Sequence, residues 1–147
     1  MTKIELDATK YAEAMAMAQK TTANVSAYRE FTGSFISAAL LTRIISRWDH
    51  KGNKKFYKFK QFCDHDLSVK GDSWCEELGI TKKEFEAAIK KIGFKKGKNK
   101  NLLTKENAIV WYYTDNNNVT WYEFRREQFN KKMHEYLINK ELGLTTF

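Results

Sequence analysis

The first third of the chain is patterned as two amphipathic helices. One apolar set predicts a helix over about residues 9–20, and it consists of Tyr11, Ala14, Met15 and Ala18. We expect this helix to pack on the body of the protein or to pair with a second copy in a homodimer. Residues 21–29 lack the pattern and predict a loop. A second set predicts a core helix that begins near Thr32 or Ser34 and ends near Trp48, and it consists of Ile36, Leu40, Ile44 and Trp48.

Three later segments are patterned as β-strands. Residues 54–62 alternate between apolar and polar side chains, with Tyr57 and Phe59 on one face. Residues 109–114 and 119–124 are rich in aromatic and β-branched side chains, and one Asp and three Asn separate the two runs. Because Asp and Asn tolerate the positive φ angles of tight turns, the last two segments predict a β-hairpin.

Between the first predicted strand and the hairpin, residues typical of helix starts and helix ends predict a helix-turn-helix. Asp72 or Ser73 can cap a short helix over residues 74–78. Gly79 follows it and can adopt the left-handed backbone that ends a helix. Thr81 can then cap a second helix over residues 82–92, and Glu84 lies three positions on, where it completes a capping box. A helix, a turn of about three residues with a glycine, and a second helix are typical of this motif.

A final helix over about residues 126–139 presents one apolar stripe, which consists of Phe129, Met133, Tyr136 and Leu137. The pattern as a whole predicts a mainly α fold with a small β-hairpin (α+β), namely a winged helix-turn-helix with extra N- and C-terminal helices. We divide the chain into an N-terminal helical arm, residues 1–31, and a winged-helix domain with the C-terminal helix, residues 32–147.

The positive charge of the chain is concentrated in one segment. The 147 residues carry a formal net charge of +8 with an isoelectric point near 9.4. Residues 82–105 contain nine lysines and two glutamates, so this short stretch holds nearly all of the excess. A cluster on one side of a protein indicates a polyanionic partner better than the total charge does.

The sequence also limits where the protein acts. No window approaches eighteen consecutive apolar residues and the first residues lack the apolar run of a secretory signal, so we expect no membrane contact and a cytoplasmic location. Two cysteines, Cys63 and Cys75, are too few for a disulfide-stapled scaffold of this length. We expect both thiols to be reduced and to lie in the core.

The second helix of the motif has one apolar and one basic face. With 100° per residue, its buried stripe is expected to consist of Phe85, Ala88, Ile89 and Ile92. The opposite face is expected to consist of Lys83, Ala87 and Lys90, with Glu86 and Lys91 at its margins. A small Ala lets the backbone approach the floor of a groove, and lysines beside it can reach phosphates. Glu86 opposes DNA binding unless it accepts a hydrogen bond from a cytosine amino group.

The lysines continue beyond this helix in a segment with glycine and asparagine, where they are Lys95, Lys96, Lys98 and Lys100. We expect this segment to lie beside the hairpin and to contact a flanking DNA backbone or minor groove. A weaker second patch near the first strand consists of Lys54, Lys55, Lys58 and Lys60. The alternative for every one of these lysines is an ordinary solvated surface.

The aromatic residues of the hairpin have two interpretations. Alternation places Trp111 and Tyr113 on one face of the strand and Tyr112 on the other. Such rings, together with Trp121 and Tyr122, can stack unpaired bases. Packing within a core or between strands is the more common role of aromatic residues on a short hairpin, and we prefer it.

Residues 72–85, which read DSWCEELGITKKEF, resemble winged-helix proteins of phages and plasmids, together with residues 56–58 before them and residues 113–115 and 120–122 after them. The similarity extends over roughly residues 32–137 and includes the N-terminal domains of phage replisome organisers and plasmid replication initiators. It implies binding of duplex DNA through the second helix of the motif and the wing. It also implies that the DNA side consists of Thr81, Lys82, Lys83, Ala87 and Lys90.

Motifs for catalysis are absent from the sequence. The segment from Gly93 to Asn99 has three residues between its glycines rather than four and lacks the Ser or Thr of a phosphate loop. Cys63, His65 and Cys75 do not have the paired spacing of a zinc site, and the nearby acids are explained by solvation and helix capping. We therefore expect no enzyme activity, no metal and no cofactor.

The sequence thus predicts a protein that binds double-stranded DNA, acting as a mobile-element regulator or replication accessory. The predicted DNA-binding residues are Thr81, Lys82, Lys83, Ala87, Lys90, Lys91, Lys95, Lys96, Lys98 and Lys100. An interaction module that uses the basic face on an acidic protein is the alternative from another functional class. Binding of RNA is a third hypothesis.

Overall fold

The computed structural model of the protein describes residues 25–141, and side chains over residues 28–139. The helix expected over residues 9–20, and the homodimer contact expected through it, lie outside these residues. The described chain is mixed α+β. Its elements are α2 (Val25–Thr32), α3 (Phe35–His50), β1 (Phe56–Tyr57), α4 (Trp74–Leu78), α5 (Lys82–Ile92), β2 (Gly93–Lys95), β3 (Val110–Thr114), β4 (Thr120–Phe124) and α6 (Arg126–Glu141).

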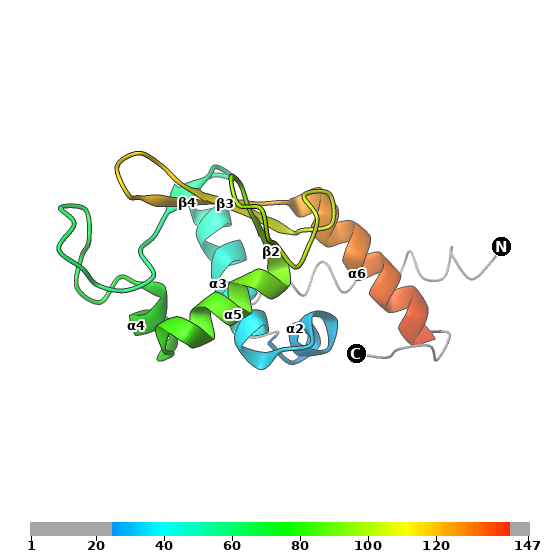
Figure 1. Ribbon diagram of the computed structural model, residues 1–147. Helices are drawn as coiled ribbons and strands as arrows, with labels where there is room; N and C mark the ends of the chain where they lie inside the picture. The colour runs from blue at the N-terminus through cyan, green and yellow to red at the C-terminus, as the bar shows by residue number, and fades with distance from the viewer. Residues whose placement is uncertain (1–24, 142–147) are drawn as a thin grey trace.

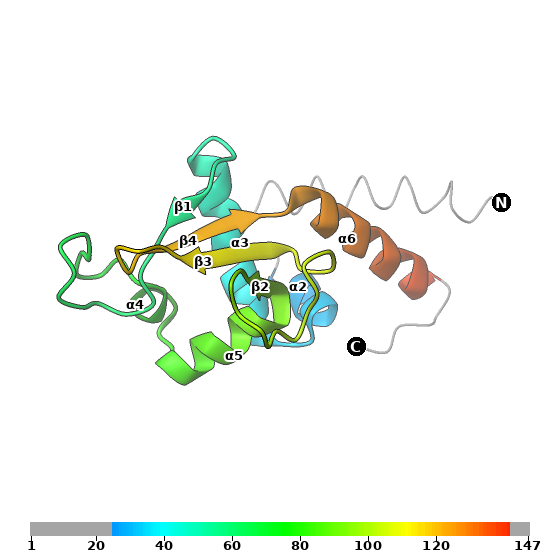
Figure 2. The same ribbon diagram turned by 45° about the horizontal axis from the view of Figure 1, so that its top comes forward.

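The four strands form one sheet with the order β1-β4-β3-β2; Figure 1 labels three of them, and all four are labelled in Figure 2. The predicted hairpin is confirmed, because β3 and β4 pair antiparallel with Tyr112 opposite Tyr122. β1 pairs antiparallel with β4 and forms one edge of the sheet. The turn of the hairpin places Asn118 at a φ of 58°, in the left-handed region that Asn tolerates.

The other edge strand, β2, was not predicted. It follows α5 directly and pairs parallel with β3, and residues 96–109 return the chain to the start of β3. Gly93 makes this close approach possible, because a Cβ atom there would lie 2.9 Å from Cε1 of Tyr112 and 3.0 Å from the carbonyl oxygen of Ile89. A strand of three residues is too short to show alternation in a sequence.

The helices cover one face of the sheet (Figures 1 and 2). Trp74 of α4 stacks on Phe85 of α5 and meets Tyr122 of β4 edge to face, so the helix-turn-helix is joined to the sheet through aromatic rings. α6 packs at one end through Phe129, which lies against Tyr28 of α2. These rings belong to one continuous buried core.

The local helix signals were correct around the helix-turn-helix. Ser73 caps α4, and Gly79 ends it at a φ of 66°. Thr81 caps α5 and exchanges hydrogen bonds with Glu84 in a complete capping box. Each of these interactions joins residues at most four apart, which is why a sequence pattern could identify them.

Two predictions of local structure were wrong. The loop expected over residues 21–29 is helical from Val25, and Tyr28 is 1% exposed because its ring packs on Phe129. The strand expected over residues 54–62 is only two residues long. Phe56 of this strand and Lys58, which follows it, point inward, whereas Tyr57 faces outward.

Candidate nucleic-acid interface

α5 presents the face that its sequence pattern predicts. Its four buried side chains are Phe85, Ala88, Ile89 and Ile92. Its exposed residues include Lys82, Lys83, Ala87, Lys90 and Lys91, and Thr81 is exposed at the cap. The hydroxyl of Thr81 accepts a hydrogen bond from the Glu84 amide, so this oxygen already holds the start of the helix.

Four lysines converge beside α5 on a cleft of about 310 Å³ between that helix and the sheet. Three were predicted: Lys90 from α5, Lys95 from β2 and Lys98 from the segment after β2. The fourth, Lys60, comes from the segment before α4. The opposite wall includes Thr114 and Thr120, whose hydroxyls are 2.8 Å apart at the hairpin end.

The cleft brings like charges close together. Burial lowers the pKa of Lys95, and the charges of Lys98 and Lys60 lower it further. Glu86 is the acid of this cleft, and it accepts a hydrogen bond of 2.9 Å from Lys60. That bond is the largest reason why the pKa of Glu86 lies below its usual value. Four ammonium groups against one carboxylate leave a positive surface suited to an anion.

The remaining predicted lysines do not join this cleft. Lys91 lines a separate cavity of about 80 Å³ that also contacts Lys132 of α6. Lys96 lies on the opposite face of the sheet, with Nζ 4.9 Å from the centre of the Trp111 ring. Lys100 is exposed in the segment between β2 and β3. The basic residues are therefore divided among several faces rather than gathered on one.

The hairpin turn itself is not basic. Asp115 accepts hydrogen bonds from the amides of Asn117 and Val119 and from the indole of Trp121. These bonds hold the turn and lower the pKa of the Asp115 carboxyl. Of the lysines expected beside the hairpin, Lys95 lies in β2, which pairs with β3, and Lys96 lies over the Trp111 and Tyr113 rings of β3. Lys98 and Lys100 lie in the segment that joins β2 to β3.

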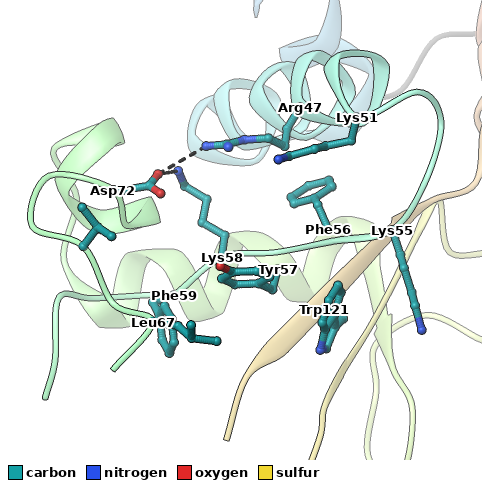
Figure 3. Close-up of a pocket in the computed structure, with 11 residues that line it drawn as sticks. Arg47, Lys51, Lys55, Phe56, Tyr57, Lys58, Phe59, Leu67, Asp72 and Trp121 are labelled. Atoms are coloured by element: carbon teal, nitrogen blue, oxygen red, sulfur yellow. Dashed lines mark hydrogen bonds and ion pairs between the residues drawn. The ribbon is translucent and has the colours of Figure 1, made fainter. Parts of the chain in front are cut away.

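A second cavity, of about 270 Å³, lies beside the edge strand β1 (Figure 3). Arg47 of α3 and Lys51, the residue that follows this helix, extend toward it. Lys58 is 3% exposed and forms ion pairs with Asp72 at 2.7 Å and with Glu77 at 2.8 Å. The alternating pattern placed Lys58 in a weak basic patch, and its neutralised, buried position excludes it from a phosphate-binding surface.

The described residues also bear on metal chemistry and on the cysteines. Over residues 28–139, no three His, Cys, Asp or Glu side chains are grouped as metal ligands. The expectation that both thiols lie in the core was wrong for Cys63, which is exposed in the irregular segment before α4, whereas Cys75 is partly buried. Burial is the main reason why the pKa of Cys75 is raised.

In the described part of the chain, none of the helices has both the length and the apolar character of a membrane span. Comparison with protein-family models, with curated proteins and with solved structures gave no match.

Proposed function

We propose that this protein binds double-stranded DNA, with α5 in the major groove and the lysine cleft against the adjacent phosphates. The convergence of Lys60, Lys90, Lys95 and Lys98 carries this proposal. Lys60 lies thirty residues or more before the other three in the sequence, and the mutual repulsion of the four ammonium groups opposes folding. A bound polyanion would neutralise these ammonium groups and so relieve their repulsion. Each phosphate contact also releases counterions, which favours binding.

The arrangement of elements supports a winged-helix interpretation. The order α3, β1, α4, α5, β3 and β4 corresponds to a helix, a strand, a helix-turn-helix and a hairpin, with β2 as an addition. In such proteins the second helix of the motif enters the major groove. Ala87 lies on the exposed face of α5, where a methyl group can contact a thymine methyl.

The resemblance of residues 32–137 to phage and plasmid winged-helix proteins supports a role in regulating or replicating a mobile element. In this role Lys82, Lys83 and Lys90 would contact phosphates, and the lysines after β2 would contact the flanking backbone. Phosphate contacts set affinity and register but carry no sequence information. Selectivity would depend on the short exposed side chains of α5.

The proposal is tested by fluorescence anisotropy with a labelled duplex at several salt concentrations. If about five phosphates are neutralised, log K should fall with log[salt] with a slope of about −4 to −5. The double variant Lys90→Glu/Lys98→Glu should bind at least about tenfold more weakly and flatten the slope by about 2. Both lysines are exposed, so the thermal melt should remain close to that of the wild type.

A matched control variant makes the same change in net charge at two lysines outside the cleft. Lys70→Glu/Lys131→Glu alters two exposed lysines, one in the segment before α4 and one on α6. It should weaken duplex binding far less than the cleft variant. Equal losses for the two variants would mean that net charge alone drives binding. No duplex binding by the wild type would overturn the proposal and favour an acidic protein partner.

A further inference from the structure

The face of the sheet turned away from the helices carries a row of aromatic side chains. Tyr57 of β1, Trp121 of β4 and Tyr113 of β3 are direct neighbours across the strands. The Tyr57 and Trp121 rings lie 5.3 Å apart at an angle of 66°. Tyr57 is 40% exposed, and the other two rings are partly exposed. In the described part of the chain, the helices lie on the other side of the sheet (Figures 1 and 2).

One lysine lies over the centre of this row. The Nζ atom of Lys55 is 5.3 Å from the centre of the Tyr113 ring and 5.5 Å from that of Trp121. It also donates a 2.8 Å hydrogen bond to the Tyr113 hydroxyl. Lys55 is exposed, so water competes for its charge and the contact with the rings is weak. A flat ligand can therefore displace this ammonium from the rings at small cost.

A second set of cationic side chains surrounds the ring of Trp111, which is the next aromatic residue on the same face. The guanidinium carbon of Arg125 lies 3.6 Å from the centre of the Trp111 ring. The Nζ atoms of Lys96 and Lys105 lie 4.9 Å and 5.2 Å from it. The indole of Trp111 donates a 2.8 Å hydrogen bond to the carbonyl oxygen of Lys105, which fixes the ring plane. Planar aromatic and guanidinium groups are the two kinds of side chain on which bases stack.

Acidic groups near this row are already engaged. Glu123 lies beside Trp111 in the register and forms a 3.4 Å ion pair with Arg125. Asp115 holds the hairpin turn and accepts the indole N–H of Trp121, which orients that ring. Lys55, Lys96 and Lys105 therefore outnumber the acids of this face. Aromatic rings bordered by cations match a ligand that has both flat bases and phosphates.

We infer that this face is a second binding site, which takes a single strand of nucleic acid. Its bases would stack on Trp121 and Tyr113, and its phosphates would pair with Lys55 and Lys96. The site does not depend on the duplex proposal, because the lysine cleft opens on the helix-covered side of the sheet. Stacking tolerates any base, so affinity should depend on strand length and salt rather than on sequence.

Quenching of tryptophan fluorescence by ten-nucleotide dT and rU strands tests this inference, because stacking on Trp121 changes its emission. The Trp121→Leu variant should bind about tenfold more weakly or worse, whereas Trp121→Phe should retain most of the affinity. Binding of the variants is measured by anisotropy of a labelled strand, and binding of either dT or rU supports the site. Phe35→Leu removes a ring that is 62% exposed on α3, and it should have no effect.

Two further measurements keep the test decisive. Should Trp121→Leu fail to fold, Tyr57→Leu and Lys55→Ala change exposed side chains of the same row and should each weaken strand binding several-fold. The cleft variant Lys90→Glu/Lys98→Glu should bind the duplex at least about tenfold more weakly and keep its affinity for the single strand, which separates the two sites. Absence of strand binding by the wild type, or equal affinity for wild type, Trp121→Leu and Phe35→Leu, would overturn the inference.

Discussion

The Nζ atom of Lys58 lies 2.7 Å from the Asp72 carboxylate, although Lys58 itself is 3% exposed (Figure 3). It also lies 2.8 Å from the carboxylate of Glu77 and 5.0 Å from the centre of the Trp74 ring. Lys58 follows β1 directly. Its partner Glu77 belongs to α4, and its partner Asp72 lies two residues before the first residue of α4. This buried ammonium therefore ties the helix-turn-helix to the edge of the sheet.

The two sides of this ion pair should respond differently to mutation. Asp72→Ala/Glu77→Ala leaves a buried ammonium without its carboxylates and should destabilise the protein by about 3 kcal/mol. Lys58→Met removes the buried charge and keeps most of the length of the side chain, so its effect should stay within about 1 kcal/mol. Urea unfolding of both variants at neutral pH measures the difference. A larger loss for Lys58→Met than for the double variant would contradict this account.

Acid should weaken the same interaction. The hydrogen bond from Lys58 is the main cause that holds the pKa of Asp72 below its usual value, and the charges of Lys58 and Arg47 add to it. A carboxyl whose pKa is lowered by folding contributes stability above the pKa of the unfolded chain, about 3.9 for Asp, and loses it as pH falls through the folded value. Asp72→Asn should therefore be less stable than the wild type at pH 6, with the gap closing below about pH 4.

Urea midpoints between pH 6 and pH 2.5 measure that convergence. Asp66→Asn is the matched control, because Asp66 is an exposed carboxylate in the same irregular segment. Its difference from the wild type should be small throughout. A gap between Asp72→Asn and the wild type that stays constant down to pH 2.5 would show that the Asp72 charge does not contribute to stability.

Gly93 should not tolerate a methyl group. Its φ of −122° suits any residue, so the obstacle is space rather than backbone strain. The new Cβ atom would meet the buried Tyr112 ring at 2.9 Å and the Ile89 carbonyl oxygen at 3.0 Å. We expect Gly93→Ala to cost about 1–3 kcal/mol in unfolding free energy.

A double-mutant cycle tests the cause of that loss. Tyr112→Leu shrinks the ring that the methyl group would meet, so Gly93→Ala should cost less in a Tyr112→Leu background than in the wild type. Gly97→Ala provides a comparison without a clash: a φ of +83° strains the backbone there, yet nothing lies within 4 Å of the added atom. Additive effects of Gly93→Ala and Tyr112→Leu would exclude the proposed contact.

The sequence predicted those parts of the fold that depend on neighbours along the chain. The capping box of Thr81 and Glu84, and the left-handed Gly79, are complete within a few residues. The helical start at Val25 was missed because the burial of Tyr28 depends on Phe129, about a hundred positions away. Alternation identified two faces of the first strand, but only the pairing with Asp72 and Glu77 decides that Lys58 points inward.

The candidate site was predictable to the same extent. The exposed face of α5 follows from helical spacing, so Lys83, Ala87 and Lys90 lie on the surface as expected. Lys95 ends β2, and the Lys96 amide that follows still donates a hydrogen bond to the Tyr112 carbonyl oxygen, so the alternation of the strand separates the two side chains. Because β2 was not predicted, these two lysines were assigned to one surface. Lys60 joined the cleft through its ion pair with Glu86, which no local pattern reveals.

Glu86 provides the sharpest test of the lysine cleft. Its carboxylate accepts a 2.9 Å hydrogen bond from Lys60, and both side chains are about two-fifths exposed, at 41% and 39%. Such a pair contributes little to stability, so Glu86→Gln should leave the thermal melt nearly unchanged. The change removes the negative charge of the cleft and frees Lys60 for a phosphate.

We therefore expect Glu86→Gln to bind duplex DNA about three- to tenfold more tightly at low salt, with the gain shrinking as salt rises. Glu106→Gln removes an exposed carboxylate from the segment that joins β2 to β3, and it should change the affinity less. Anisotropy titrations at two salt concentrations measure both effects. Weaker binding by Glu86→Gln would instead indicate that this carboxylate accepts a hydrogen bond from a base, since the amino group of cytosine donates to Glu in the major groove.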